Sequence, residues 1–205
     1  MRKLLIVILL WSVVRLSAQD VLMQDDEPCG IEGTAKRSND REQNRLKNRW
    51  TMPTARDFDP NFNWSTLSEF EDDSDKFSNE KAAILRGYVL RVRMSEKETC
   101  NCNSENPDFR DTHLIITPSH DETGVLQQII VEITPRLRMK MRELGVDWSQ
   151  QALKKLVGKQ VELQGWLFYD WKHGRQSAKV MQKKKGVTRS TAWEIHPVTS
   201  IKILN

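Results

Sequence analysis

The 205-residue sequence lacks the short motifs that mark several large enzyme classes. It has no P-loop, no Gly-x-Ser-x-Gly elbow, no His-Glu-x-x-His motif and no glycine-rich dinucleotide turn. These absences exclude P-loop nucleotide hydrolases, typical α/β-hydrolases, zincin metalloproteases and dinucleotide-dependent dehydrogenases. The sharper RNA-binding motifs are also missing. The sequence has no internal repeats and no heptads, which excludes solenoids and coiled coils.

The apolar run at the N-terminus is too short to cross a bilayer as a helix. Arg2 and Lys3 precede this run, Leu4–Val14, and the small residues Ser17 and Ala18 follow it. This order predicts a signal peptide over residues 1–18, cut near Ala18, and an exported protein that is periplasmic or secreted. No membrane span is expected after cleavage; a retained, membrane-anchored N-terminus is the alternative.

Cysteine is scarce, with only Cys29, Cys100 and Cys102. An exported protein is expected to hold an oxidised pair. A bond between Cys100 and Cys102 would close a strained ring, so we expect Cys29 to pair with Cys100 or Cys102 and to leave one thiol. A zinc site built from the three cysteines and a histidine is the alternative, although the paired spacing usual for zinc is missing.

The net charge of +4 falls to +1 once residues 1–18, with Arg2, Lys3 and Arg15, are removed. The remaining charge is uneven. Residues 57–80 hold eight acids against one lysine, and residues 136–189 hold fourteen basic residues against four acids. The two regions could attract each other, the basic one could face a polyanion or an anionic surface, or both could be solvated surface.

The chain divides into the signal, a polar and acidic arm over residues 19–81, and a β-rich domain over residues 82–205. Residues 38–50 predict a short helix with Ser38 or Asn39 as its N-cap. The acidic part of the arm contains six apolar side chains, which predict that it lies across the domain: Phe58, Phe62, Trp64, Leu67, Phe70 and Phe77.

Five runs in the domain have strand character, and the first, residues 82–94, is interrupted by Gly87, which predicts a bend or bulge. The others are residues 112–118, 127–135, 159–171 and 191–204. Residues 147–158 predict a helix capped by Asp147 or Ser149, with Leu153, Leu156 and Val157 on its apolar side; residues 136–144 fit a strand or a helix.

This order predicts a mainly β fold, a five-stranded Greek-key barrel of the OB type with one helix between its third and fourth strands. Another small barrel or sandwich with one helix is the alternative. The sequence resembles exported bacterial OB-fold proteins of no assigned activity. The resemblance is carried by RLKNR (45–49), GYV (87–89), CNC (100–102), DTH (111–113), EITPR (132–136), GWLFYD (165–170) and WEIHPVT (193–199). It implies a fold and an exported location.

Polar residues with catalytic chemistry stand at alternate positions of the predicted strands. If the registers agree, six candidates converge on one side of the barrel: His113, Glu132, Asp170, His173, Glu194 and His196. A divalent metal ion as cofactor would take its ligands from His113, His173, His196 and Glu194. Without a metal, histidine and glutamate could act as base and acid on a phosphodiester, with Arg136, Arg138 or Arg175 stabilising charge.

Each candidate also has a structural reading. His196, followed by proline near a strand end, could simply donate to a backbone carbonyl. Glu132 and Asp170 could pair with basic residues. Asp111 could orient the ring of His113 or end a turn.

Basic residues after the fourth strand, together with two arginines after the third, predict a binding surface for nucleic acid, a glycan or a protein, since cations follow phosphates and rings stack on bases. The alternative is a soluble loop over core aromatics. The candidates are Arg136, Arg138, Trp171, Lys172, Arg175, Lys183, Lys184, Lys185 and Arg189. We therefore expect an exported OB-fold protein that binds an anionic polymer or an envelope protein. The alternatives are a metal-assisted phosphodiester hydrolase and a structural envelope protein.

Overall fold

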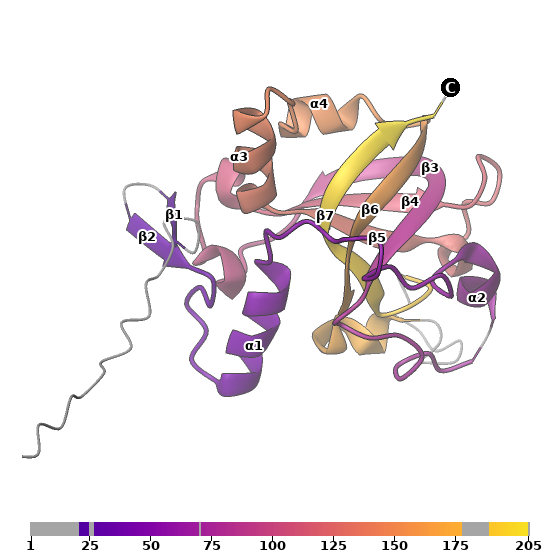
Figure 1. The fold of residues 1–205 in the computed structure, drawn as a ribbon, viewed down its shortest axis with the longest axis horizontal. Helices are drawn as coiled ribbons and strands as arrows, with labels where there is room; N and C mark the ends of the chain where they lie inside the picture. Colours follow the sequence, from indigo (N-terminus) through magenta and orange to yellow (C-terminus); the bar gives the residue numbers. More distant parts are fainter. Residues whose placement is uncertain (1–20, 25–26, 70, 178–188, 205) are drawn as a thin grey trace, which may run out of the picture.

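The computed structural model describes residues 21–24, 27–69, 71–177 and 189–204. The chain is mainly β, as expected, and its centre is a closed five-stranded barrel with strand order β3-β4-β5-β7-β6 (Figure 1). The strands are β3 (Ala82–Met94), β4 (Thr112–Thr117), β5 (Ile129–Ile133), β6 (Gln160–Tyr169) and β7 (Trp193–Ile203). The predicted signal peptide and the basic residues Lys183, Lys184 and Lys185 lie outside the described residues.

Neighbouring barrel strands are antiparallel except for β5 and β7, which pair in parallel at Val131 and Ile195. Two helices, α3 (Pro135–Glu143) and α4 (Gln150–Lys154), lie between β5 and β6. The ambiguous segment 136–144 is thus largely helical. Thr134 caps α3 by accepting from the Leu137 amide, and proline fits the first turn, where its missing N–H costs nothing.

Helix α4 is shorter than the predicted helix, and Ser149 rather than Asp147 caps it by accepting from the Ala152 amide. Leu153 and Leu156 are buried, but Val157 is 48% exposed. The prediction that Val157 belongs to the apolar side is wrong, because the helix ends at Lys154 and the chain turns before Val157 can face the barrel.

Strand β3 serves two sheet neighbours. Its first half, to Tyr88, pairs with β6, and its second half, from Tyr88, pairs with β4. Gly87 stands at this change, where a Cβ would come within 2.6 Å of Ile116 and of the Thr117 carbonyl. The register shift itself lies between Val89 and Arg91, so Gly87 permits a close strand approach and the bulge follows it.

The barrel interior is a continuous apolar core in which the inward residues of all five strands meet. Three residues of the acidic arm join it, Phe62, Leu67 and Phe77, with Phe62 and Phe77 ring centroids 4.9 Å apart. Trp64, at the start of α2 (Trp64–Ser68), packs against the core and donates to the Arg86 carbonyl. Burying such rings offsets the entropy of ordering the arm. Phe70 is outside the described residues.

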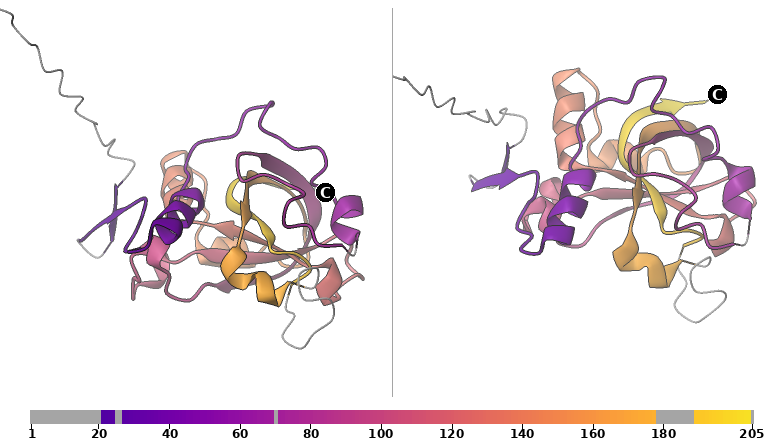
Figure 2. Two further views of the ribbon diagram at one scale, coloured as in Figure 1. Left: turned by 90° about the horizontal axis from the view of Figure 1, so that it is seen from below. Right: turned by 60° about the horizontal axis from the view of Figure 1, so that its bottom comes forward.

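The N-terminal part of the arm lies beside the barrel. The hairpin of β1 (Val21–Gln24) and β2 (Glu27–Gly30) is followed by α1 (Ser38–Lys47), and both lie at the same side of the molecule (Figures 1 and 2). Helix α1 falls within the predicted range, but its cap position is Arg37 rather than Ser38 or Asn39. The Arg37 side chain makes no capping hydrogen bond and instead donates to Asp40. Among the described residues, no helix is long and apolar enough to cross a membrane.

A disulfide joins Cys29 of β2 to Cys102, beside the short 3₁₀ helix η1 (Thr99–Asn101). The prediction that Cys29 is oxidised is confirmed, and the partner is Cys102, whereas Cys100 is a buried free thiol. The bond holds the arm against the loop between β3 and β4. It therefore fixes α1 next to the outer face of β4, β5 and β7.

Candidate functional site

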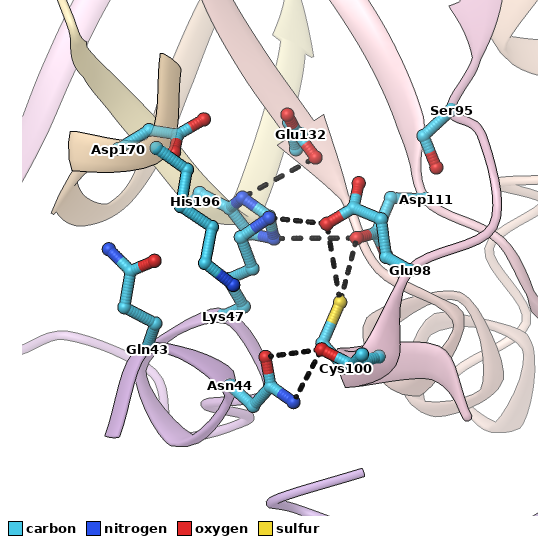
Figure 3. Close-up of polar contacts among 12 residues, drawn as sticks. Gln43, Asn44, Lys47, Ser95, Glu98, Cys100, Asp111, Glu132, Asp170 and His196 are labelled. Carbon is cyan, nitrogen blue, oxygen red and sulfur yellow. Dashed lines mark hydrogen bonds and ion pairs between the residues drawn. The ribbon is translucent and has the colours of Figure 1, made fainter. Parts of the chain in front are cut away.

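Alternation along three strands puts polar side chains on the outer face of the barrel. Trp193 and Ile195 point into the core, so Glu194 and His196 point outward. His113 and Glu132 are register partners on β4 and β5. The outer face is not solvated: Glu194 and His196 are fully buried and Glu132 is 3% exposed. The site is therefore a buried polar cluster, covered by α1 and the η1 loop (Figure 3).

His196 is at the centre of the cluster. Its Nδ1 lies 3.4 Å from Glu132 Oε2 and 3.4 Å from Glu194 Oε2, and its Nε2 lies 3.6 Å from Asp111 Oδ2. Figure 3 shows the ring between Glu132 and Asp111. The ring therefore faces three carboxylates and does not serve as a simple donor to a backbone carbonyl. Burial lowers the pKa of His196, but Glu132, Glu194 and Asp111 raise it more, and the pKa is raised overall.

His113 lies at the edge of the buried cluster and is 9% exposed. Its Nε2 is 3.1 Å from Glu132 Oε1, an ion-pair distance. Burial lowers the pKa of His113, yet the Glu132 charge leaves it raised. Burial likewise opposes ionisation of Glu132, but His113 and His196 hold its pKa well below the usual value. Glu132 is thus the carboxylate that both imidazoles share.

A second group adjoins the first where β6 ends. His173 Nδ1 is 2.5 Å from Asp170 Oδ2, and Arg189 pairs with Glu194 and lies 3.7 Å from Asp170. Arg189 is 3% exposed, so its charge is balanced within the protein. The structure therefore brings all six catalytic candidates of the sequence into one neighbourhood, linked through Arg189 and Glu194.

The sequence analysis missed three members of the cluster: Lys47, Glu98 and Asp111. Lys47 Nζ of α1 is buried and lies 2.5 Å from a Glu98 carboxylate oxygen, and Cys100 Sγ is 3.6 Å from Glu98 and 3.9 Å from Asp111. Asp111 was considered only as a partner of His113 or a turn residue. Asp111 stands two residues before His113, and this spacing could have predicted that both side chains lie on the same face. No such pattern in the sequence links Lys47 or Glu98 to the cluster, because they come from other elements.

The ionisation states follow from burial and pairing. Burial raises the pKa of Asp111 to about 6, with the neighbouring Glu132 adding to the effect and His196 opposing it. Burial also raises the pKa of the Cys100 thiol well above its usual value, and Glu98 and Asp111 raise it further. Cys100 is therefore a protonated thiol at neutral pH. For Lys47 burial lowers the pKa, but Glu98 and other acids raise it well above normal, so the amine is charged.

A pocket of about 550 Å³ opens beside the cluster. Its walls come from α1, the end of β3, the loop that carries η1, β4 and the segment after β6. Five lining residues are cationic, two are carboxylates and two are histidines: Lys47, Arg93, Lys97, Lys172, Arg189, Glu96, Glu98, His113 and His173. The pocket wall is thus net positive, and its volume is typical of small-molecule sites.

The binding candidates from the sequence divide between several places. Lys172 and Arg189 line the pocket, with Lys172 Nζ 2.9 Å from Asp40. Arg136 is buried and donates to the Cys29 carbonyl, and Arg138 donates to the Asp108 carbonyl, so neither reaches the pocket. Trp171 is 48% exposed. The Arg175 side chain and the residues Lys183, Lys184 and Lys185 lie outside what the structure describes.

Comparison of the chain with protein-family models and with curated proteins gives no match.

Proposed function

We propose that the chain is an exported OB-fold protein that binds an anionic ligand in the pocket beside the polar cluster. The strand order β3-β4-β5-β7-β6, with β5 and β7 parallel and helices between β5 and β6, supports an OB-type Greek-key barrel. The disulfide between Cys29 and Cys102 supports an oxidising location outside the cytoplasm.

The location of the pocket is the main support. OB-folds bind oligonucleotides and oligosaccharides at the second and third strands and at the loops after the first and fourth strands. Here the pocket is lined by Ser95–Thr99 from the loop after β3, by His113 of β4, and by Lys172 and Arg189 from the connection between β6 and β7. The pocket thus coincides with the ligand-binding region of the proposed fold.

The charge of the pocket favours an anion. Five Lys or Arg side chains and two carboxylates line it, an excess of three positive charges among the lining residues. Four of these cations also pair with acids of the protein: Lys47, Lys97, Lys172 and Arg189. Asn44, Thr99 and Asn103 add neutral hydrogen-bonding groups. Such a wall suits a phosphate, sulfate or carboxylate group, with cations drawing the ligand in and polar groups orienting it.

Arg93→Gln tests the proposal. Arg93 lies on β3, lines the pocket and stands opposite His113 in the register. A labelled eight-residue oligothymidylate is the first probe and a sulfated glycan the second, with binding followed by fluorescence anisotropy. We expect Arg93→Gln to weaken binding about tenfold, since a hydrogen bond to a charged group contributes roughly 1.5–3 kcal/mol. Affinity should also fall steeply as salt rises.

Arg86→Gln is the matched control, because Arg86 is on the same strand but pairs with Glu162 away from the pocket. An equal loss of affinity in Arg86→Gln and Arg93→Gln would mean that binding depends only on the net charge of the protein. If the wild-type protein binds neither the oligothymidylate nor the sulfated glycan, the proposal is contradicted. Cleavage of the oligonucleotide would favour the hydrolase.

A further inference from the structure

Three buried side chains in the cluster have the arrangement of a metal-ligand set. Asp111, Glu132 and His196 each offer one ligand atom, and these atoms all lie within 4.8 Å of one another. Metal–ligand bonds of about 2.0–2.2 Å at tetrahedral angles separate neighbouring ligand atoms by roughly 3.3–3.6 Å. His196 Nε2 lies 3.6 Å from Asp111 Oδ2, at the upper end of that range, and Glu132 Oε2 lies 3.4 Å from the other ring nitrogen, Nδ1.

Several atoms of this group lack a hydrogen-bond partner within the described part of the chain. They are Asp111 Oδ1, Glu132 Oε2 and His196 Nε2, in residues that are 0–3% exposed. A buried polar atom without a hydrogen-bond partner is unfavourable, and a charged one is more so. These atoms belong to the three side chains whose ligand atoms lie within 4.8 Å of one another, and a bound cation would satisfy them.

The charge of the cluster favours a cation as that ligand. Among the described residues it contains five carboxylates, Glu98, Asp111, Glu132, Asp170 and Glu194, and two permanent cations, Lys47 and Arg189. With the imidazoles neutral, the state in which histidine binds a metal, and the acids ionised, the difference is −3. When no ion is bound, protons on the histidines, whose pKa values are raised, offset part of this charge. One divalent ion reduces it to −1, and so lowers the repulsion between buried carboxylates.

The Nδ1 atom of His196 is held by a carboxylate that is not one of the three ligands. This atom lies 3.4 Å from Glu194 Oε2, and Glu194 is in turn paired with Arg189. A histidine that donates Nδ1–H to a carboxylate presents Nε2 to a metal, an arrangement common around ligating histidines. Nε2 has no hydrogen-bond partner among the described residues, so it is the ring nitrogen that can bind the ion.

Two other groups of side chains have a spacing that fits a metal ion, but their atoms are less available to bind one. Glu98, His113 and Glu132 form one, and Glu98, Cys100 and Asp111 form another. Both need Glu98, which already binds the Lys47 ammonium. The second also needs a thiolate, which the acidic surroundings of Cys100 disfavour.

We infer that Asp111, Glu132 and His196 bind one divalent transition-metal ion of the zinc class, with Glu194 as the positioning residue for His196. Imidazole favours zinc over magnesium or calcium, and carboxylates complete the set. Three protein ligands leave a fourth position for water. The site goes beyond anion binding and does not depend on it.

Titration of chelator-treated protein with Zn²⁺, followed by calorimetry, tests the inference. We expect one ion per chain, and at least a hundredfold weaker binding for Asp111→Asn and for His196→Gln. His173→Gln is the matched control, since His173 also pairs with a carboxylate but lies outside the three ligands. Cys100→Ser should also bind normally, because the thiol is not a ligand.

The wild type gives a readout that does not depend on the folding of a variant. Nitrogen NMR of the histidine rings should show Nε2 of His196 shifting on addition of one equivalent of Zn²⁺, with Nδ1 still protonated. An imidazolium at His196 that is unchanged by the ion would overturn the inference. Failure of the wild type to take up stoichiometric metal, or equal uptake by the folded Asp111→Asn variant, would overturn it as well.

Discussion

At the scale of single residues, Gly33 of the arm is tightly constrained. Its φ is +57°, and a Cβ there would lie 1.8 Å from the Thr99 carbonyl oxygen. The Thr34 amide donates to the same carbonyl at 2.9 Å, so the segment approaches η1 backbone to backbone. Only glycine fits both the left-handed conformation and the close approach.

We therefore predict that Gly33→Ala lowers the free energy of unfolding by about 3 kcal/mol or more, because the arm must move away from η1. Gly145→Ala is the matched control: its φ is +77°, but a Cβ there meets nothing within 4 Å. That variant should lose only about 1 kcal/mol. Urea unfolding of both variants measures the difference, and equal losses would show that the close contact contributes nothing.

At the scale of single residues, the sequence predicted correctly those features that depend only on neighbours along one strand. Alternation correctly separates Trp193 and Ile195 from Glu194 and His196. It could not show that the outward face is buried, since that depends on α1, which lies about 150 residues earlier in the chain.

At the scale of elements, the disulfide and α1 act together. Cys29 and Cys102 are 73 residues apart in sequence, and their bond holds β2 at η1. Asn48, directly after α1, donates to the carbonyls of Ile31 and Cys100, and Asn44 donates to the Glu32 carbonyl. These bonds fix the helix that carries Lys47 over the polar cluster.

We predict that the double variant Cys29→Ser, Cys102→Ser loses about 4 kcal/mol of stability, the chain-entropy estimate for a loop of this length. Amide hydrogen exchange in α1 should increase more than exchange in the barrel strands, because the disulfide anchors the arm. Cys100→Ser is the control and should retain the disulfide and most of the stability. A comparable loss in Cys100→Ser would mean that Cys29 pairs with Cys100.

At the scale of the whole molecule, the cluster makes stability depend on pH. The hydrogen bond to Asp170 raises the pKa of His173, although burial opposes it. Burial raises the pKa of Asp170, but His173, Lys47 and Arg189 lower it overall. The histidine contribution is complete below its unfolded pKa of about 6.5 and is lost as pH rises through the folded value. The aspartate contribution is present above about pH 3.8 and is lost as pH falls through its lowered folded value.

The pair should therefore stabilise the fold most between about pH 4 and 6.5. We predict that His173→Gln reduces the free energy of unfolding more at pH 5.5 than at pH 8.5. The difference should be below about 1 kcal/mol, since the His173 side chain is 44% exposed. His120→Gln, at the exposed turn after β4, is the control. A loss that is independent of pH would mean that His173 contributes by packing alone.

The sequence by itself determined the local features of this protein. Alternation and turn residues predicted the barrel strands, and the cap of α4 was narrowed to Asp147 or Ser149, of which the structure shows Ser149. These features depend on residues close together in the chain, so a short window contains them.

Only the tertiary structure decided which distant groups meet. Strand register places Glu132 beside both His113 and His196. The arm places Lys47 over these residues, and the fold brings Cys29 next to Cys102 rather than Cys100. A shift of one residue in β7 would turn His196 into the core and Trp193 and Ile195 out of it, so burial of these two apolar residues fixes which face His196 occupies. The burial of the cluster, and with it the chemistry proposed for it, is therefore a property of the long-range contacts.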